Sequence, residues 1–400
     1  MLSKVEDRPQ TQSHAHPVAL KRPRMVVGIT SDQTCLVLTG RLRALRHAGF
    51  DITLVSSPGE ELKRMAESER ITAHPLPMRR GISPIADLRS LVALLRFLMR
   101  ERPLITDFST PKAGLLGNFA GWMLRVPHRV YTLRGLKLES SRGWRQRLLL
   151  YAERVSARCS HVVLCNSASL RLEAIRLRIA PAAKLQILGN GSSNGVNTRR
   201  FSPGKSTVRK NLNIPEDDLV LGFVGRLTND KGIPELLTAF EEIIRVGPRV
   251  WLLLVGWFDA SEDALAGHWR SRIADHPCIR HTGYVADPEN YYRAMDMLIL
   301  PTHREGFPNA ILEASACGLP VITTETTGAR DAVVPEVTGL LIPPHAPQAI
   351  AKAAMELIVD PERRKRMGLA GRAWVGERFS QEHVLGLAAD FYRDLLANRQ

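Results

Sequence analysis

Residues 297–324 read MLILPTHREGFPNAILEASACGLPVITT and contain one complete strand, helix and strand. The runs 297–302 and 320–324 are apolar and of strand length, whereas the residues between them suit a loop followed by a helix. Pro308 suits the first turn of that helix, where the missing amide hydrogen of proline costs nothing. Apolar strands separated by a helix are typical of a parallel sheet that is covered on both faces. The sequence therefore predicts an α/β fold.

The same alternation continues on both sides of this unit. Further apolar runs of strand length lie at 25–30, 51–57, 103–108, 128–133, 161–166, 185–189, 218–225, 250–256 and 279–284. A polar stretch with several prolines and glycines interrupts the alternation at 194–215, which is typical of a linker. Because 400 residues exceed what one compact core holds, we predict two similar α/β domains that face a common cleft. The expected segments are a flexible tail at 1–23, a first domain at 24–200, a linker at 201–217, a second domain at 218–379 and a C-terminal helix at 380–400.

Two expected helices carry an apolar face that needs a partner surface. In the helix at 85–100 this face would consist of Leu88, Leu91, Val92, Leu95, Leu98 and Met99. In the helix at 381–399 it would consist of Val384, Leu385, Leu387, Phe391 and Leu395.

The sequence contains no sign of export or of a membrane span. The first 22 residues lack the apolar run of a signal peptide, and no stretch approaches the ~20 apolar residues of a spanning helix. The five cysteines are scattered, odd in number and without the spacing of a metal-binding set. These features predict a protein of the reducing cytoplasm.

Positive charge is concentrated in the first half of the chain. Residues 1–200 hold 33 Lys and Arg against 14 Asp and Glu, while residues 201–400 hold 22 against 26. This division predicts that one half meets an anionic surface, such as nucleic acid or an anionic membrane leaflet; the alternative is a solvated Arg-rich surface. Aromatic residues are not interleaved with the arginines, which disfavours nucleic acid.

The segment FVGRLTNDKG at 223–232 has the residues of a diphosphate site. It follows an apolar run, and Gly225 lets a ligand approach the backbone closely. Arg226 and Lys231 place two cations at the carboxyl end of the expected strand, where they suit a diphosphate whose charge grows as it leaves. The alternative is a solvated turn with two surface cations.

The helix that follows Pro308 has its own potential for binding phosphate. The amides of Asn309 to Ile311 would be free at its N-terminus, where backbone donors and the helix dipole favour an anion. Glu305 precedes this helix and Glu313 lies in its second turn, so both carboxylates could accept hydrogen bonds from sugar and ribose hydroxyls. The alternatives are a surface or capping role for Glu313 and, for Glu305, an ion pair with Arg304 or Arg330.

These motifs together resemble a known family. The two glutamates spaced as in EGFPNAILE, followed by Gly318, Pro320 and Val321, look like the donor site of the family-4 retaining glycosyltransferases. FVGRLTNDKG is similar to the Arg/Lys pair of the same family. The segments TPKAGLLG at 110–117, YTLRGL at 131–136 and LGNGSSNGV at 188–196 resemble the bacterial members that build capsule, O-antigen or exopolysaccharide units on a polyprenyl-diphosphate carrier.

The resemblance implies a GT-B fold with two Rossmann-like domains, in which the C-terminal helix packs back on the N-terminal domain. The second domain would hold the nucleotide-sugar donor, and the first would hold the acceptor. No divalent metal and no other cofactor would be needed. The implied roles are donor diphosphate for Arg226 and Lys231, sugar hydroxyls for Glu305, ribose for Glu313, phosphates for the backbone of Gly306, Phe307, Pro308 and Asn309, and base for Tyr284 and Val285.

The implied reaction retains the configuration of the sugar. The acceptor hydroxyl attacks from the face that the diphosphate leaves, and a departing phosphate oxygen helps to remove its proton. Arg226, Lys231 and Glu305 are the expected catalytic residues.

The first half departs from the family at one position of interest. Many members have a His where this chain has Arg134, which could add positive charge at the donor or be a plain loop cation. Thr110 and Lys112, at the start of a helix that faces the cleft, are candidates for contact with an acceptor phosphate.

The expected function is transfer of a sugar, with UDP as the default nucleotide, to a polyprenyl-diphosphate-linked saccharide at the inner face of the cytoplasmic membrane. A transferase with a soluble sugar or sugar-phosphate acceptor is the first alternative. A nucleotide-sugar 2-epimerase is the second, and the acceptor motifs at 110–117 argue against it.

Overall fold

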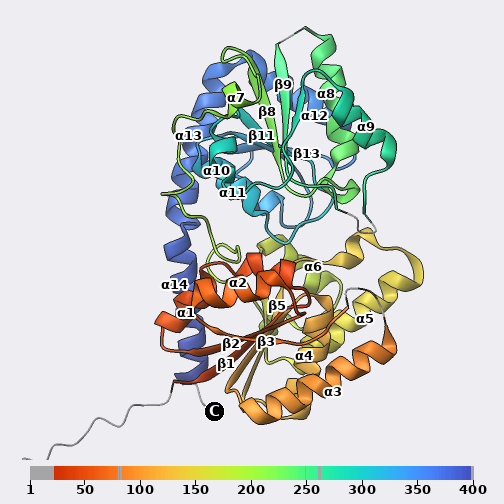
Figure 1. The fold of residues 1–400 in the computed structure, drawn as a ribbon, viewed down its shortest axis with the longest axis vertical. Helices are drawn as coiled ribbons and strands as arrows, with labels where there is room; N and C mark the ends of the chain where they lie inside the picture. Colours follow the sequence, from red (N-terminus) through yellow and green to blue (C-terminus); the bar gives the residue numbers. More distant parts are fainter. Residues whose placement is uncertain (1–21, 80, 82, 248, 260–262, 398–400) are drawn as a thin grey trace, which may run out of the picture.

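A computed structural model of the chain describes residues 22–79, 81, 83–247, 249–259 and 263–397. Within these ranges the chain forms two α/β domains, one below the other in Figure 1. The expected tail at 1–23 lies almost entirely outside the described residues. None of the described helices combines the length and the apolar composition that crossing a membrane requires.

The N-terminal domain is built on a parallel sheet of seven strands in the order β3-β2-β1-β4-β5-β6-β7. Its strands are β1 (Arg24–Gly28), β2 (Asp51–Ser56), β3 (Thr72–Pro75), β4 (Ile105–Ser109), β5 (His128–Leu133), β6 (Val162–Cys165) and β7 (Leu185–Gln186). The sequence predicted all of them except β3. That strand lies at the sheet edge with partly exposed residues, and its sequence TAHP lacks the apolar run that marks the buried strands.

The C-terminal domain has a parallel sheet of six strands in the order β10-β9-β8-β11-β12-β13. Its strands are β8 (Leu219–Val224), β9 (Val250–Val255), β10 (Ile279–His281), β11 (Met297–Leu300), β12 (Val321–Thr324) and β13 (Gly339–Ile342). The sequence missed β13, because only a turn of 3-10 helix at Arg330–Ala332 separates it from β12 and the strand–helix alternation lapses there. In both sheets the order reverses beside the first strand of the domain, where ligands of such sheets bind.

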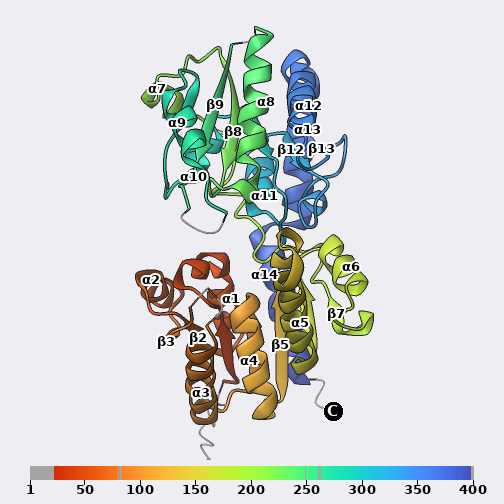
Figure 2. The same ribbon diagram turned by 90° about the vertical axis from the view of Figure 1, so that its right-hand side faces the viewer.

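Helices cover both sheets (Figures 1 and 2). Those of the N-terminal domain are α1 (Arg41–His47), α2 (Glu60–Glu69), α3 (Pro84–Glu101), α4 (Pro111–Met123), α5 (Gly143–Cys159) and α6 (Ala168–Arg176). Those that follow are α7 (Val208–Asn211), α8 (Ile233–Arg245), α9 (Gly267–Asp275), α10 (Pro288–Tyr292), α11 (Asn309–Ala316), α12 (Pro347–Val359), α13 (Pro361–Arg378) and α14 (Gln381–Ala397).

Helix α3 packs through only part of the predicted face, with Leu91, Leu95 and Leu98 against the core. Its buried apolar side chains are Leu94, Phe97 and Leu98, whereas Leu88 is 62% exposed and Met99 is 51% exposed. The helix carries two adjoining apolar stripes, and contact with α4 buries only one of them. The prediction was therefore wrong for the outer stripe, which stays open to solvent.

The expected linker at 201–217 is part of the C-terminal domain rather than a free tether. The ring of Phe201 packs edge-on against Tyr292 at 5.9 Å, and Arg209 forms an ion pair with Asp296 at 2.8 Å. Polar sequence with prolines and glycines predicted a linker, and these contacts join the segment to the core of the second domain.

The chain passes between the domains at two adjacent points. The Val196 amide donates to the Phe379 carbonyl at 2.8 Å, and the Gln381 amide donates back to Val196 at 2.8 Å. Helix α14 then runs down beside α1, as the blue helix of Figure 1 shows. Tyr392 on α14 is fully buried and donates to Asp107 at 2.7 Å, so the predicted return of the C-terminal helix to the N-terminal domain is confirmed.

Candidate active site

A cavity of about 280 Å³ lies between the domains, at the carboxyl ends of both sheets. Loops after β4 and β5 form the wall that belongs to the N-terminal domain, called the N-terminal wall. Loops after β8 and β11 form the opposite wall, which belongs to the C-terminal domain and is called the C-terminal wall. The lining residues are Thr110, Pro111, Tyr131, Arg134, Gly135, Leu136, Lys137, Arg226, Asp230, Lys231, Arg304, Glu305 and Gly306. The cleft predicted between the domains is thus present, and it contains the three expected catalytic residues.

Lys231 and Glu305 form a direct ion pair inside this cavity. Their side chains are only 14% and 18% exposed. The two residues follow β8 and β11, which are neighbours in the sheet, so their loops emerge side by side. The ammonium of Lys231 is the recorded partner of Glu305, in place of the arginines that sequence reasoning considered.

Asp230 is a site residue that the sequence analysis missed. It is 3% exposed, accepts a hydrogen bond from Thr228 at 2.6 Å and lies 3.0 Å from Arg304 and 3.8 Å from Arg226. Burial raises its pKa, but the Thr228 hydroxyl and the charges of Lys231 and the two arginines outweigh burial, so the pKa is lowered. Asp230 is therefore an ionised carboxylate that organises the cations of the cavity. The available signal was its place in the NDK turn of the diphosphate motif.

Arg226 projects from the start of the loop after β8. Its guanidinium donates to Asp259 at 2.6 Å, and its side chain is 33% exposed. Burial lowers the pKa of Arg226, but Asp259 and Asp230 outweigh burial and raise it, so the cation is permanent. Gly225 has φ of +151°, and a side chain at Gly256 would strike the Gly225 carbonyl, so the backbone here is packed too closely for larger residues.

Arg134 faces these cations from the N-terminal wall. Its guanidinium donates to the Ser109 hydroxyl at 3.1 Å and to the Ser193 hydroxyl at 2.7 Å. Burial, with the nearby positive charge of Arg41, lowers the pKa of Arg134 to about 10, which leaves it charged at neutral pH. The residue is thus a positioned cation of the cavity wall. Whether it contacts a ligand stays a prediction.

The two domains approach each other closely at Gly306. A Cβ atom at this position would overlap the Arg134 carbonyl, and one at Gly135 would lie 3.2 Å from the Gly306 amide nitrogen. A side chain at Gly306 would therefore force the two walls apart.

Helix α11 begins one residue later than predicted. Pro308 is its N-cap, and the Ile311 amide donates to the Pro308 carbonyl at 3.2 Å. The expectation of a free amide at Ile311 is therefore wrong. Phe307 is buried against the ring of Phe379 at 5.2 Å, so its side chain is part of the core, and only its backbone could serve a ligand. Asn309, the first residue of the helix, is partly exposed.

Thr110 and Lys112 separate into different environments. Thr110 lines the cavity with an unusual φ of +69°, and its hydroxyl lies 2.6 Å from the Thr30 hydroxyl. A β-branched residue with positive φ is strained, and such strain occurs mostly at functional sites. The ammonium of Lys112 instead forms an ion pair with Asp87 at 2.6 Å and is outside the cavity lining. Both predicted acceptor contacts stay predictions.

The remaining predicted donor residues lie outside the cavity lining. Glu313 accepts a hydrogen bond from Tyr292 at 2.8 Å, and burial raises its pKa. Tyr284 is 64% exposed and meets Trp257 edge-on at 5.7 Å, with Val285 partly buried beside it. Their roles at ribose and base stay predictions.

Two family models match the chain, one over each domain. The model described as glycosyl transferases group 1 matches residues 204–374. The model described as glycosyl transferase 4-like domain matches residues 38–191.

Individual relatives cover nearly the whole chain. A capsular polysaccharide biosynthesis glycosyltransferase of Staphylococcus aureus is 33% identical over 94% of this chain and 98% of the relative. A UDP-Gal:alpha-D-GlcNAc-diphosphoundecaprenol alpha-1,3-galactosyltransferase of Escherichia coli is 26% identical over 88% of this chain and 90% of the relative. Among solved structures, a sucrose-phosphate synthase of Thermosynechococcus elongatus shares the fold with a TM-score of 0.79 at 21% identity, covering 94% of this chain and 100% of the other.

Proposed function

The chain belongs to the group 1 glycosyl transferases, and from that premise we propose that it transfers a sugar from a UDP-sugar to a polyprenyl-diphosphate-linked saccharide. Membership makes it a glycosyltransferase enzyme with the GT-B fold. Its similarity to the staphylococcal capsular enzyme supports a place in polysaccharide biosynthesis. The UDP donor and the lipid-linked acceptor are named in the Escherichia coli relative and are proposed for this chain by analogy.

The observation that carries the proposal is the group of cations in the interdomain cavity. Arg226, Lys231 and Arg304 line the C-terminal wall, and Arg134 lines the wall opposite. Such a group suits a diphosphate, because fixed cations stabilise the negative charge that develops on the leaving group. The side chains themselves supply this positive charge, so we propose that transfer needs no metal ion.

The ion pair between Lys231 and Glu305 has a clear use in this scheme. Until a donor binds, each of these mostly buried charges keeps the other partnered, which avoids the cost of an unpaired charge. When the donor binds, Lys231 would turn to the diphosphate. Glu305 would then be released to accept hydrogen bonds from sugar hydroxyls.

The proposed reaction breaks one bond and forms one at the same carbon. The bond from the anomeric carbon to the diphosphate oxygen breaks, and the acceptor oxygen bonds to the anomeric carbon from the same face. The acceptor proton passes to the departing phosphate oxygen, so no protein base is needed and the configuration is retained. The protein holds both reactants on one face of the sugar and stabilises the leaving diphosphate.

The acceptor side of the proposal rests on the outer surface of the N-terminal domain. Helices α3, α4 and α5 lie side by side and face the viewer in Figure 2. We call their exposed apolar side chains the outer patch. Its members are Ile85, Leu88, Val92, Met99, Trp122, Met123, Trp144, Leu148 and Tyr151. Exposed arginines surround them at positions 89, 96, 100, 125, 142, 145, 147, 154 and 158.

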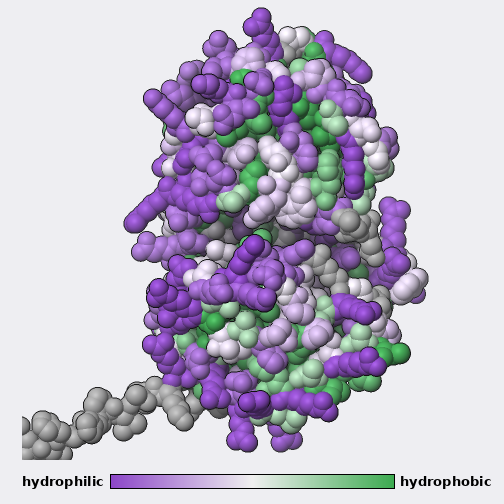
Figure 3. Space-filling view, viewed as in Figure 1, coloured by the Kyte–Doolittle hydropathy of each residue, from purple (hydrophilic) through white to green (hydrophobic). Residues whose placement is uncertain are grey.

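This composition suits an anionic membrane surface. Apolar side chains enter the interface between lipid headgroups and acyl chains, while arginines meet anionic headgroups. Figure 3, viewed as Figure 1, shows hydrophobic residues among hydrophilic ones on the surface of the lower, N-terminal domain. Trp144, at the start of α5, is 66% exposed, and the chain reaches it a few residues after Lys137 of the cavity wall. We therefore propose that the enzyme sits peripherally on the cytoplasmic face of the membrane, with the cavity near its lipid-linked acceptor.

Thermal shift and transfer assays on the purified chain test this function. UDP is expected to raise the melting temperature more than GDP or ADP, and a matching UDP-sugar should extend a polyprenyl-diphosphate saccharide in detergent. Failure of every nucleoside diphosphate to stabilise the protein would overturn the donor site. Transfer to a free sugar or sugar phosphate, without transfer to the lipid-linked saccharide, would replace the proposed acceptor by a soluble one.

A further inference from the structure

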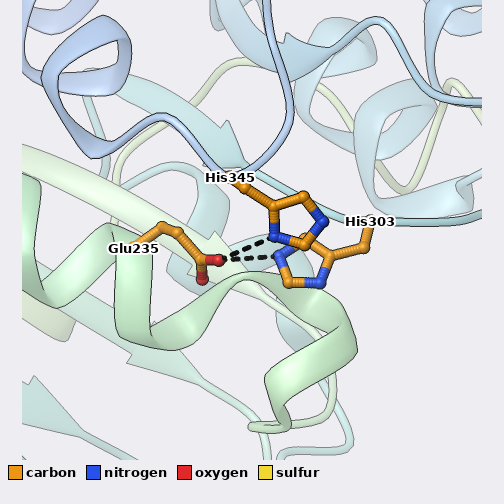
Figure 4. Close-up of side chains that lie close together, drawn as sticks. All are labelled: Glu235, His303 and His345. Atoms are coloured by element: carbon orange, nitrogen blue, oxygen red, sulfur yellow. Dashed lines mark hydrogen bonds and ion pairs between the residues drawn. The ribbon is translucent and has the colours of Figure 1, made fainter. Parts of the chain in front are cut away.

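Glu235, His303 and His345 meet at the carboxyl edge of the C-terminal sheet (Figure 4). Glu235 lies in the first turn of α8, His303 lies in the loop after β11, and His345 lies in the loop between β13 and α12. Helices α8 and α12 pack against each other, which brings these distant loops together. The group lies beside the cavity but outside its lining.

One carboxylate oxygen holds both imidazoles. The His303 Nε2 atom lies 2.9 Å from Glu235 Oε1, and the His345 Nδ1 atom lies 3.2 Å from the same oxygen. The ring centroids are 3.8 Å apart. The ligand atoms of all three side chains lie within 4.8 Å of one another, so a small shift would place them around one ion.

Hydrogen bonds within the cluster do not account for the second carboxylate oxygen of Glu235. Glu235 Oε2 is buried, and within the described part of the chain it accepts no hydrogen bond. Burial raises the pKa of Glu235, but hydrogen bonds from His303, the backbone and His345 outweigh burial and lower it, so the group carries its charge. A buried carboxylate oxygen without a partner costs free energy that a bound cation would recover.

The donor set indicates the class of ion. Two imidazole nitrogens and one carboxylate suit zinc and its neighbours, cobalt and nickel, whereas magnesium and calcium prefer oxygen ligands alone. Three protein ligands leave a coordination position for water. His345 is 65% exposed at its side chain, which opens the group to solvent and to an entering ion.

We propose that Glu235, His303 and His345 form a binding site for a transition-metal ion of the zinc class. The ion takes the place of the imidazole N–H groups that face Glu235 Oε1, and each neutral ring then carries its proton on its other nitrogen. This site is separate from the transfer chemistry and does not depend on the proposed donor or acceptor. His303 precedes Glu305 by two residues and Glu235 follows Lys231 by four, so an ion here fastens together the two loops of the Lys231–Glu305 pair.

Zinc binding to the full-length protein tests the proposal directly. After treatment with a chelator and its removal, titration calorimetry with ZnCl₂ is expected to show one site per chain. Zinc at about 100 times its dissociation constant should raise the melting temperature by about 5 °C. Magnesium and calcium chloride should give no comparable shift. Cobalt bound to the protein should give a visible absorption band of low-coordinate Co²⁺.

The variant His345→Asn removes one proposed metal ligand without disturbing the fold. His345 has φ of +57°, and asparagine tolerates this backbone region, so the exposed loop should keep its shape. The variant should lose the stabilisation by zinc and the cobalt band, while His383→Ala, which removes an exposed histidine from α14, should keep both. Wild-type protein that binds no zinc, or zinc binding that is unchanged in His345→Asn, would overturn the proposal.

Discussion

Lys231 and Glu305, which are 74 residues apart in the sequence, form an ion pair at the carboxyl edge of the C-terminal sheet. The pairing follows from topology, since β8 and β11 are adjacent and each residue lies in the loop after one of them. Two residues expected to touch different parts of a donor are thus each other's partner in the structure. In the proposed function, donor binding exchanges this ion pair for contacts with the ligand.

Replacing Lys231 by Ala should reduce the turnover number by about 10²-fold or more, because a fixed cation at the leaving diphosphate is removed. The measurement is steady-state transfer with saturating donor and acceptor. Melting temperature must be followed as well, since Glu305 loses its partner in a mostly buried position. Lys352→Ala removes an exposed lysine of α12 and serves as the matched control, with activity unchanged.

Glu305→Gln separates the two halves of this pair. Gln keeps a hydrogen-bond acceptor for sugar hydroxyls and frees Lys231, so its turnover should fall less than that of Lys231→Ala. Near-normal turnover in Lys231→Ala, or a larger loss in Glu305→Gln, would show that the chemistry depends on the carboxylate instead.

Replacing Arg134 by Ala should lower kcat/KM for the donor by roughly 10-fold or more, because a hydrogen-bonded cation of the cavity wall disappears. Ser109→Ala removes one of the two hydroxyls that hold the guanidinium and should cause a smaller loss, which identifies Ser109 as a positioning residue. Unchanged kinetics in Arg134→Ala, with the usual melting temperature, would make this residue a plain loop cation.

Periodicity predicted the sheets well because buried parallel strands are apolar throughout. It failed at the edge strand β3, which is not apolar, and at β13, which is apolar but follows a turn instead of a helix. It also misjudged which apolar residues of α3 are buried. The sequence of a helix with two apolar stripes does not indicate which stripe its neighbour α4 will cover. The choice depends on packing between elements.

The sequence predicted which residue types line the candidate site, but it predicted fewer of the contacts between them. Arg226, Lys231 and Glu305 stand out because their motifs place them after strands. Asp230 was missed because its burial and its three cationic neighbours arise only when the loops after β8 and β11 meet. The group of Glu235 and His345 spans 110 residues, and no local pattern relates two loops that far apart.

Glu153 gives the N-terminal domain a dependence on pH. It is 3% exposed and accepts a hydrogen bond from Tyr131 at 2.5 Å, and burial raises its pKa to about 7 although the hydrogen bond lowers it. A raised carboxyl pKa means that the folded state keeps its proton longer than the unfolded state. Stability is therefore highest below the ordinary carboxyl pKa and falls as the pH rises to about 7.

Glu153→Gln should remove this loss, because Gln is neutral at every pH and still offers an oxygen to Tyr131. Relative to the wild type, the variant should gain on the order of 2 kcal/mol between mildly acidic and mildly alkaline pH. Chemical denaturation at both pH values measures the difference. Glu382→Gln, at an exposed position of α14, should change stability equally at both. A constant difference for Glu153→Gln would mean that the carboxyl titrates normally.

The outer patch makes the acceptor side of the proposal testable. Trp144 and Leu148, on the first turns of α5, are 66% and 41% exposed and stand among arginines. Changing both to Ser should weaken binding to vesicles rich in phosphatidylglycerol by about tenfold or more, because two apolar side chains no longer enter the membrane interface. Leu172→Ser, at an apolar position of α6 that is 58% exposed, is the control outside the patch and should leave binding intact. Flotation at low and at high salt separates the electrostatic contribution of the arginines from the contribution of apolar burial, since salt screens only the former. Wild-type protein that ignores these vesicles at low salt would remove the membrane from the proposal and favour a soluble acceptor.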